Sequence, residues 1–351
     1  MKIVGKRPAL AWEAQRKASA TGGSAFETPK RDSMRIASLL PSVTEILFAI
    51  GAGDRIVGVT HECDFPAPAR GLPVLTSSLL PPELQTQLGT RSPSAGQANK
   101  IDRHVRASVH SGSSLYALDA ELLARLAPDA IVTQELCVVC AVSYEIVARA
   151  AKRISGAGPT VLSLEPSSLE DVYANILTLG ELAGAVDGAQ ALLAGLRRRE
   201  AALRERHSGT PRSRVLLLEW TDPPMSGGHW TPGLIELAGG DPLLAQPGAN
   251  SARLDWAAIE AADPDVVVVA PCGYDLAHAR AAADELETNP IWRGLRAVRT
   301  GRAYAMDGNA YVNRPGPRLL DTAEILAAVI AGAPGQADAF APISCRYSTS
   351  P

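Results

Sequence analysis

The sequence is short of the features that define several large classes of protein. Its 351 residues include only 5 cysteines, an odd number without the spacing of a disulfide framework; this excludes a disulfide-stabilised mini-protein and favours a reducing compartment. The richest apolar run, residues 266–270, is far shorter than the roughly 20 residues that cross a bilayer and predicts a buried parallel strand. The net charge of −3 provides no basic field and argues against a nucleic-acid partner.

Sequence motifs of common enzyme classes are also missing. Neither a phosphate-binding G-x-x-x-x-G-K loop nor a G-x-G-x-x-G turn after a strand occurs, so no nucleotide-binding signature is present. The G-x-S-x-G elbow of serine hydrolases is absent as well. Because no motif requires catalysis, we expect a binding protein without catalytic residues.

The first 34 residues differ in charge from the rest of the chain. They hold seven Lys or Arg and three Asp or Glu, a local net charge of +4. Residues 35–351 therefore carry a net charge of −7, and the two parts together give the −3 of the whole chain. The apolar stretch at residues 8–12 ends at Glu13 and is shorter than a secretory signal needs. We therefore expect residues 1–34 to be a flexible extension, with Met34 as an alternative start. A cytoplasmic protein follows, and a periplasmic protein with a divergent export signal is the alternative.

From residue 35 onward, short apolar runs alternate with helical patterns. The run at residues 35–40 is followed by Pro41 and by Ser42 and Glu45, which have the spacing of a capping box, and Gly51 is expected to end that helix. Apolar residues at helical spacing continue from about 168 to 206, with a break near 184–188 as an alternative. Further strands are expected at residues 55–60, 129–133, 160–164, 214–220, 266–269 and 302–306. This alternation predicts an α/β fold with parallel sheets.

The same pattern divides the chain into lobes. We expect an N-terminal αβ lobe at 35–166, a long connecting helix at 167–207, a C-terminal αβ lobe at 212–333 and a tail at 334–351. A weak repeat supports two related lobes, since Leu-Asp precedes a Pro-Asp strand by ten residues twice, at Leu118 and at Leu254, an offset of 136 residues.

Polar and aromatic residues gather just past the predicted strands. Ligands of open parallel sheets bind outside the carboxyl ends of the strands, so these residues predict a site between two lobes. The alternative is that the small residues cap strands and the tryptophans fill gaps in the core. The candidate ligand-binding residues are Pro41, Ser42, His61, Glu62, Asp64, Glu219, Trp220, His229, Trp230, Tyr274, Asn309, Tyr311 and Arg314. Among them, Trp220, His229 and Trp230 offer flat apolar faces and a nitrogen ligand to a large planar compound.

Four cysteines follow predicted strands. Cys137 and Cys140 form a C-x-x-C motif before a helix expected at about 141–153, where a thiol pKa is lowered. With His61, Cys63 and Cys272 they form a candidate tetrahedral zinc or cobalt site. A disulfide switch and ordinary packing are the alternatives.

Several of these segments resemble one known family. Residues 35–47 (RIASLLPSVTEIL), 56–60 (IVGVT) and the Pro128-Asp129 pair before a strand resemble the helix-linked, class III substrate-binding proteins of ABC importers for vitamin B12 and ferric siderophores, over about residues 35–330. The segments 61–64 (HECD), 137–140 (CVVC), 218–220 (LEW), 228–230 (GHW), 307–311 (DGNAY) and 313–318 (NRPGPR) are similar to the subgroup named cobalamin-binding proteins.

The resemblance implies both a fold and a function. It implies two Rossmann-like lobes joined by one long helix, with cobalamin or a related metal chelate held in the cleft, and little movement on binding because a helix is a stiff connector. We also expect the protein to be a monomer. It also implies docking on an ABC permease through an acidic residue in each lobe. Glu121, seven residues before Pro128, fits this role, whereas Ala257 stands at the matching place before Pro264 and Glu260 lies one turn further along.

Three alternatives to an importer subunit follow from the residues. A soluble binder without a transporter would account for the missing export signal. A thiol- or metal-dependent enzyme that uses the Cys/His cluster would account for the cysteines near the expected cleft, and a partner-binding protein that keeps only the fold is a third possibility.

Overall fold

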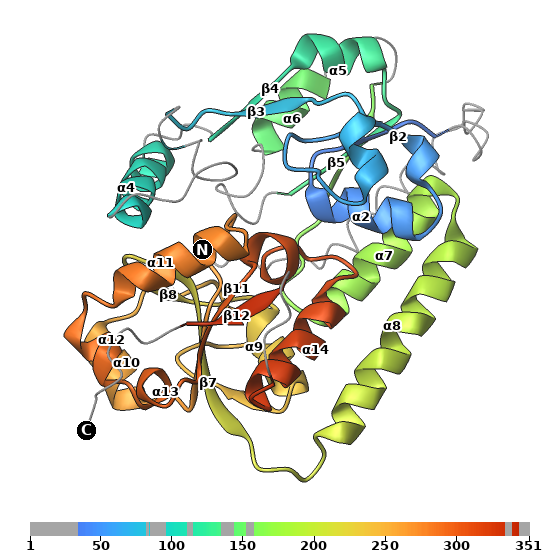
Figure 1. The fold of residues 1–351 in the computed structure, drawn as a ribbon. Coiled ribbons are helices and arrows are strands. Elements are labelled where there is room, and N and C mark those ends of the chain that lie inside the picture. The colour runs from blue at the N-terminus through green and yellow to red at the C-terminus, as the bar shows by residue number, and fades with distance from the viewer. Residues whose placement is uncertain are drawn as a thin grey trace, which may run out of the picture. The chain divides into compact units, whose positions relative to one another are not determined.

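The chain folds as two units, each with its own sheet (Figure 1). The computed structural model describes residues 34–81, 84, 96–110, 115–134, 144–151, 158–333 and 339–343. Unit 1 comprises Met1–Leu79, Ser113–Glu165 and Glu170–Ala194, and unit 2 comprises Leu80–Gly112, Pro166–Leu169 and Gly195–Pro351. Within the described ranges, no helix is both long and apolar enough to cross a membrane.

Unit 1 is built on a four-stranded parallel sheet in the order β2-β1-β5-β6. Its central strands β1 and β5 are buried along their whole length, as expected for a sheet covered on both faces. The elements of this unit are β1 (Ile36–Ser38), α2 (Pro41–Ala49), β2 (Ile56–Gly58), β3 (Thr76–Ser78), β4 (Tyr116–Leu118), α5 (Ala120–Leu126), β5 (Ala130–Thr133), α6 (Tyr144–Ala151) and β6 (Thr160–Ser163), with 3-10 turns at Gly53–Arg55 and Ala67–Gly71. Strands β3 and β4 form a separate antiparallel pair.

Unit 2 is built on a mixed sheet in the order β12-β11-β10-β7-β8, with β9 paired to β7. Strand β10 runs parallel to both β7 and β11. Its elements are α4 (Gln97–His110), β7 (Ser213–Thr221), β8 (Pro224–Ser226), α9 (Thr231–Leu237), β9 (Gly240–Pro242), α10 (Trp256–Ala262), β10 (Val266–Val269), α11 (Leu276–Leu286), α12 (Pro290–Gly294), α13 (Arg296–Arg299), β11 (Ala303–Met306), a π-helix (Gly308–Val312), α14 (Leu319–Ile330) and β12 (Phe340–Pro342).

The two faces of the unit 2 sheet are covered by different helices (Figure 1). Alternate residues of β7 and β10, such as Leu216, Leu218 and Val267, join the core formed with α10 to α13. The opposite face of β7 points toward α9 and α14. Because both faces of the sheet are buried, its strands consist of continuous apolar runs, and these runs allowed the strands to be predicted from the sequence.

The connecting segment consists of two helices, α7 (Leu169–Ala183) and α8 (Val186–Arg206). The helix is interrupted at Gly184, whose φ of +69° favours glycine. The alternative of a break near 184–188 is therefore confirmed. At Gly180 an added Cβ would stand 2.5 Å from the Ala189 Cβ. The small residues therefore let the two helices approach closely.

One helix start predicted from the sequence is wrong. Helix α2 begins at Pro41, with Leu40 as N-cap and no side-chain cap, so Ser42 and Glu45 do not form a capping box. Proline suits the first helical position because it has no N–H and a fixed φ. Because Pro41 already occupies this position, Ser42 lies inside the helix and is not its N-cap. Gly51 follows the helix with a φ of +79°, as expected.

The repeat has a shared structural role in both units. Asp119 and Asp255 are the N-caps of α5 and α10. Ten residues on, the Asp129 carboxylate accepts the backbone N–H of Arg35 at 2.8 Å, and the Asp265 carboxylate accepts that of Arg214 at 2.8 Å. Each Leu-Asp/Pro-Asp pair therefore caps a helix and ties the following strand to its neighbour. The predicted α/β fold is confirmed.

Candidate functional site

In unit 2, several candidate residues lie at one edge of the sheet. Strands β7, β10 and β11 are parallel, so the segments that follow them meet at their common carboxyl edge. The Trp220 ring lies edge-on to the Tyr274 ring with centroids 5.5 Å apart. The backbone N–H of Asn309 donates to the Tyr274 carbonyl at 3.0 Å. The structure thus brings Trp220, Tyr274 and Asn309 together from three strand ends.

A single turn of π-helix, Gly308–Val312, follows β11. Such turns are rare and occur frequently at functional sites. Gly308 permits it, because a Cβ there would stand 2.3 Å from the Pro271 carbonyl oxygen. The turn presents Asn309, which accepts a hydrogen bond from the buried Arg314 guanidinium at 3.2 Å, and Tyr311, whose ring lies 5.7 Å below the Arg318 guanidinium.

His229 and Trp230 lie on the loop between β8 and α9, and their rings stack at 5.6 Å. The Trp230 indole N–H donates to the Val312 carbonyl at 2.8 Å, and the residue is only 9% exposed. Trp230 therefore joins this loop to the π-helix and has little surface to offer a ligand. His229 is partly exposed, and its Nδ1 atom is buried without a hydrogen-bond partner among the described residues.

Burial controls the electrostatics of this edge. It lowers the pKa of His229, which favours the neutral imidazole that coordinates metals. It raises the pKa of Glu219, an effect that hydrogen bonds from the Ser251 hydroxyl and the Gly228 N–H only partly offset. It also raises the pKa of Tyr274 to about 12, with a further contribution from Glu285. The edge therefore presents the partly exposed Trp220 indole and a neutral imidazole, with the Tyr274 ring, 1% exposed, buried behind them.

The unit 1 candidates lie at the carboxyl edge of the other sheet. Pro41 and Ser42 follow β1, and Ser42 is buried. After β2, the His61 Nδ1 and the Thr76 hydroxyl are hydrogen-bonded at 2.7 Å. The neighbouring Glu62 accepts a hydrogen bond from the Tyr116 hydroxyl at 3.2 Å, while Asp64 lies partly exposed in the same loop.

Tyr116 is a residue that the sequence analysis missed. Its ring lies 5.5 Å from that of His61, and it comes from β4, 55 positions further along the chain. Strand β4 is only three residues long, and no local sequence pattern marks its contact with the distant His61.

The cysteines do not form a metal centre in the part of the chain that the structure describes. The buried Cys63 thiol lies 3.2 Å from the Thr44 hydroxyl and 3.3 Å from the Thr60 hydroxyl, and Cys272 is a free, partly exposed thiol in the other unit. No group of three or more His, Cys, Asp or Glu suited to a metal ion occurs among the described residues. Cys137 and Cys140 lie outside them.

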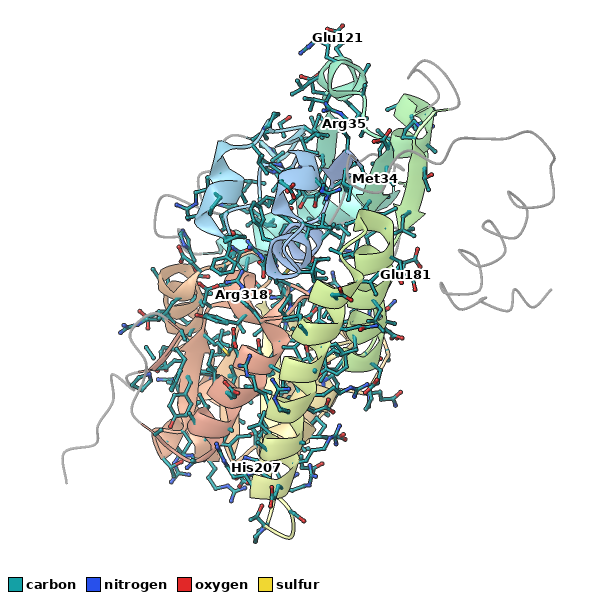
Figure 2. The ribbon with its side chains drawn as sticks, turned by 90° about the vertical axis from the view of Figure 1, so that its right-hand side faces the viewer. Met34, Arg35, Glu121, Glu181, His207 and Arg318 are labelled. Carbon is teal, nitrogen blue, oxygen red and sulfur yellow. The ribbon has the colours of Figure 1, made fainter. Side chains whose placement is uncertain are left out.

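Glu121 lies in the first turn of α5. Figure 2 shows it at one end of its unit, and its side chain is exposed. Ala257 and Glu260 lie on α10, and Glu260 is exposed. A docking role for Glu121 stays a prediction.

Comparison with known proteins gives one family. The sequence profile of a family described as periplasmic binding protein matches residues 36–310. An uncharacterized ABC transporter substrate-binding lipoprotein of Bacillus subtilis is 26% identical over 309 residues, which cover 86% of this chain and 81% of that protein. A cobalamin-binding protein of Halobacterium salinarum is 25% identical over 293 residues, which cover 82% of this chain and 66% of that protein.

Solved structures share the fold. The periplasmic vitamin B12-binding protein of Vibrio cholerae superimposes with a TM-score of 0.59 at 20% identity, covering 86% of this chain and 97% of that one. The periplasmic heme-binding protein of Roseiflexus sp. RS-1 gives a TM-score of 0.61 at 22% identity, covering 86% and 98%. At these identities the likeness establishes the architecture and leaves the ligand open.

Proposed function

This chain belongs to the periplasmic binding protein family, and from that premise we propose that its ligand is cobalamin or a related metal-chelate macrocycle. The family consists of non-enzymatic binding proteins, so the chain is a substrate-binding protein of the ABC-transporter type. The thiol- or metal-dependent enzyme considered from the cysteines loses its basis. The expected cytoplasmic location gains no support, because relatives are named lipoproteins or periplasmic proteins, and we place the protein outside the cytoplasm.

The observation that carries the ligand class is the aromatic edge of unit 2. Trp220 offers a partly exposed indole there, which suits the flat face of a macrocycle, while the Tyr274 ring, only 1% exposed, packs against the indole from within the unit. Glu219, the neighbour of Trp220, accepts a hydrogen bond from Gly228, the neighbour of His229, so the imidazole lies in the same region. A neutral imidazole in the region of the partly exposed Trp220 indole is suited to a planar compound that carries a metal.

The relatives support two ligands within this class. Proteins named for binding cobalamin and vitamin B12 are among the curated relatives, and proteins named for binding heme are among the similar structures. The resemblance of segments such as 218–220 and 228–230 to cobalamin-binding proteins favours cobalamin. Heme is the second candidate, and the neutral imidazole of His229 favours it.

Titration of the full-length protein with cyanocobalamin and, separately, with hemin tests the proposal. We expect binding of one of them in the micromolar range or tighter, about −8 kcal/mol or more favourable, measured by equilibrium dialysis and by quenching of tryptophan fluorescence. Trp220→Phe should weaken binding, because the larger indole face is lost. Trp256→Phe is the matched control, since Trp256 packs on the core of unit 2.

Binding of neither compound would refute the ligand class. Equal losses in the two tryptophan variants would refute the assignment of the site to the edge that carries Trp220. Binding of both compounds with similar affinity would show a site that recognises the macrocycle and not its metal.

A further inference from the structure

We infer that Glu219 is a positioning residue that fixes His229 for the ligand and makes no ligand contact itself. This inference rests on the proposed function and changes the role that the sequence suggested for Glu219. Four observations carry it: the backbone of His229, the loop that holds it, the hydrogen bond that the Glu219 carboxylate accepts from Gly228 and the lack of space at Gly228.

His229 has an uncommon backbone. Its φ of +51° lies in the left-handed region, which is unfavourable for residues other than glycine. The other described non-glycine residues of this kind have ordinary explanations, since Ala127 and Asp263 end helices α5 and α10 and Leu244 follows β9. His229 precedes a helix, where no such conformation is needed, and strain of this kind clusters at functional sites.

A second loop holds His229 in this conformation. The His229 N–H donates to the Ala249 carbonyl at 2.6 Å, and the Gly248 N–H donates to the His229 carbonyl at 3.0 Å. Residues 245–251 belong to no helix or strand. The orientation of the imidazole therefore depends on where this second loop is fixed.

The Glu219 carboxylate holds the loop that carries His229. Its Oε2 accepts the backbone N–H of Gly228 at 3.3 Å, one residue before His229, and Gly228 in turn packs against Ser251 of the second loop. Glu219 itself lies on β7, a long strand buried in the sheet. The carboxylate thus ties the loop that carries His229 to the sheet of the unit.

The loops also touch at Gly228. A Cβ there would stand 2.4 Å from the Ser251 backbone nitrogen and 2.8 Å from the Ala249 carbonyl oxygen. Only glycine lets the backbones meet this closely. The Glu219 carboxylate is engaged by the Gly228 N–H at this contact, so the partly exposed His229 imidazole is the group left to meet a ligand.

A double-mutant cycle separates positioning from simple stabilisation. The variants are Glu219→Ala, Glu219→Gln, His229→Ala and the Glu219→Ala/His229→Ala double variant of the full-length chain, with cyanocobalamin and hemin as probes. The control is Glu236→Ala, which removes an exposed carboxylate of α9 and should leave affinity unchanged.

Glu219→Ala should weaken binding about tenfold, or about 1.4 kcal/mol, whereas Glu219→Gln, which keeps a hydrogen-bond acceptor, should stay within about twofold of wild type. In the His229→Ala background, Glu219→Ala should add less than about twofold, because the group that it positions is gone. Independent, additive losses in the cycle would overturn the inference, and so would equal losses in the Gln and Ala variants.

A ligand-free measurement keeps the inference testable if neither probe binds. The imidazole pKa of His229, followed by NMR of histidine-labelled protein, should return toward its ordinary value in Glu219→Ala and stay lowered in Glu219→Gln. An unchanged pKa in Glu219→Ala would overturn the inference. A changed pKa without binding of either probe would support it and refute only the proposed ligand class.

Discussion

The left-handed backbone of His229 allows a stability test in which glycine and alanine are compared. His229→Gly and His229→Ala remove the same imidazole, including its buried Nδ1, so the difference between them reports the backbone alone. At a φ of +51°, a residue with a Cβ pays about 1 to 2 kcal/mol. Glycine avoids this cost but lowers the stability by about 0.5 to 1 kcal/mol, because it gives the unfolded chain more conformational freedom to lose on folding. We therefore expect the Gly variant to be about 0.5 to 1 kcal/mol more stable.

The same pair of substitutions at an exposed helical position provides the control. Glu236 lies in α9 with its side chain exposed, and there glycine should be about 0.8 to 1 kcal/mol less stable than alanine. The assay is urea unfolding of the full-length variants, monitored by circular dichroism, with midpoints compared at equal slopes. If alanine is as stable as glycine at position 229, the strain assigned to His229 is absent and the reasoning is refuted.

Three further predictions concern the frame around the site. Gly308→Ala should destabilise the protein by about 1 to 3 kcal/mol and weaken ligand binding, because its Cβ would meet the backbone of Pro271; an unchanged affinity by equilibrium dialysis would contradict a role for the π-helix. Asp129→Ala and Asp265→Ala should each lower the free energy of unfolding in urea by about 1 kcal/mol, since they leave the backbone N–H groups of Arg35 and Arg214 without these partners. The two effects should add because the residues share no partner. Strong coupling between them would argue against separate units. Because folding raises the pKa of Glu219, the folded state binds more protons than the unfolded state, and the free energy of unfolding should fall as the pH rises from the ordinary carboxylate range through this raised pKa. Glu219→Gln should reduce this pH dependence in unfolding experiments between about pH 4 and 8. An identical pH dependence in the variant would show that Glu219 does not titrate in this range.

The sequence predicts the frame of the fold well, because the frame depends on local patterns. The strands β5 and β10 are buried along their whole length and apolar except for Thr133 at the end of β5, so their type and position follow from the local pattern of apolar residues. The break at Gly184 follows from glycine's freedom at positive φ. The predicted start of α2 is wrong because two local signals, a proline and a serine, compete for adjacent positions, and only the folded chain shows which of them prevails.

The candidate site is less accessible to sequence reasoning because its contacts connect distant segments. The rule that ligands bind beyond the carboxyl ends of parallel strands identifies Trp220 and Tyr274, and the structure places their rings 5.5 Å apart. It does not separate residues that face a ligand from residues that hold others in place. Trp230 is an example, since its hydrogen bond spans 82 positions to Val312 and leaves the indole buried. Nothing in the local sequence marks that bond.

The two units show how one repeated frame can carry different surfaces. Asp119 and Asp255 cap equivalent helices, so positions two residues further on are equivalent as well, and they hold Glu121 in one unit and Ala257 in the other. On an α-helix, the three-residue step from Ala257 to Glu260 is a rise of about 4.5 Å and a turn of about 60° away from the starting direction. Glu260 therefore keeps the same side of α10 but lies one turn further from its N-terminus. Because capping residues are needed for folding and the exposed positions beside them are not, the repeat constrains the caps and leaves the acidic positions free to differ between the units.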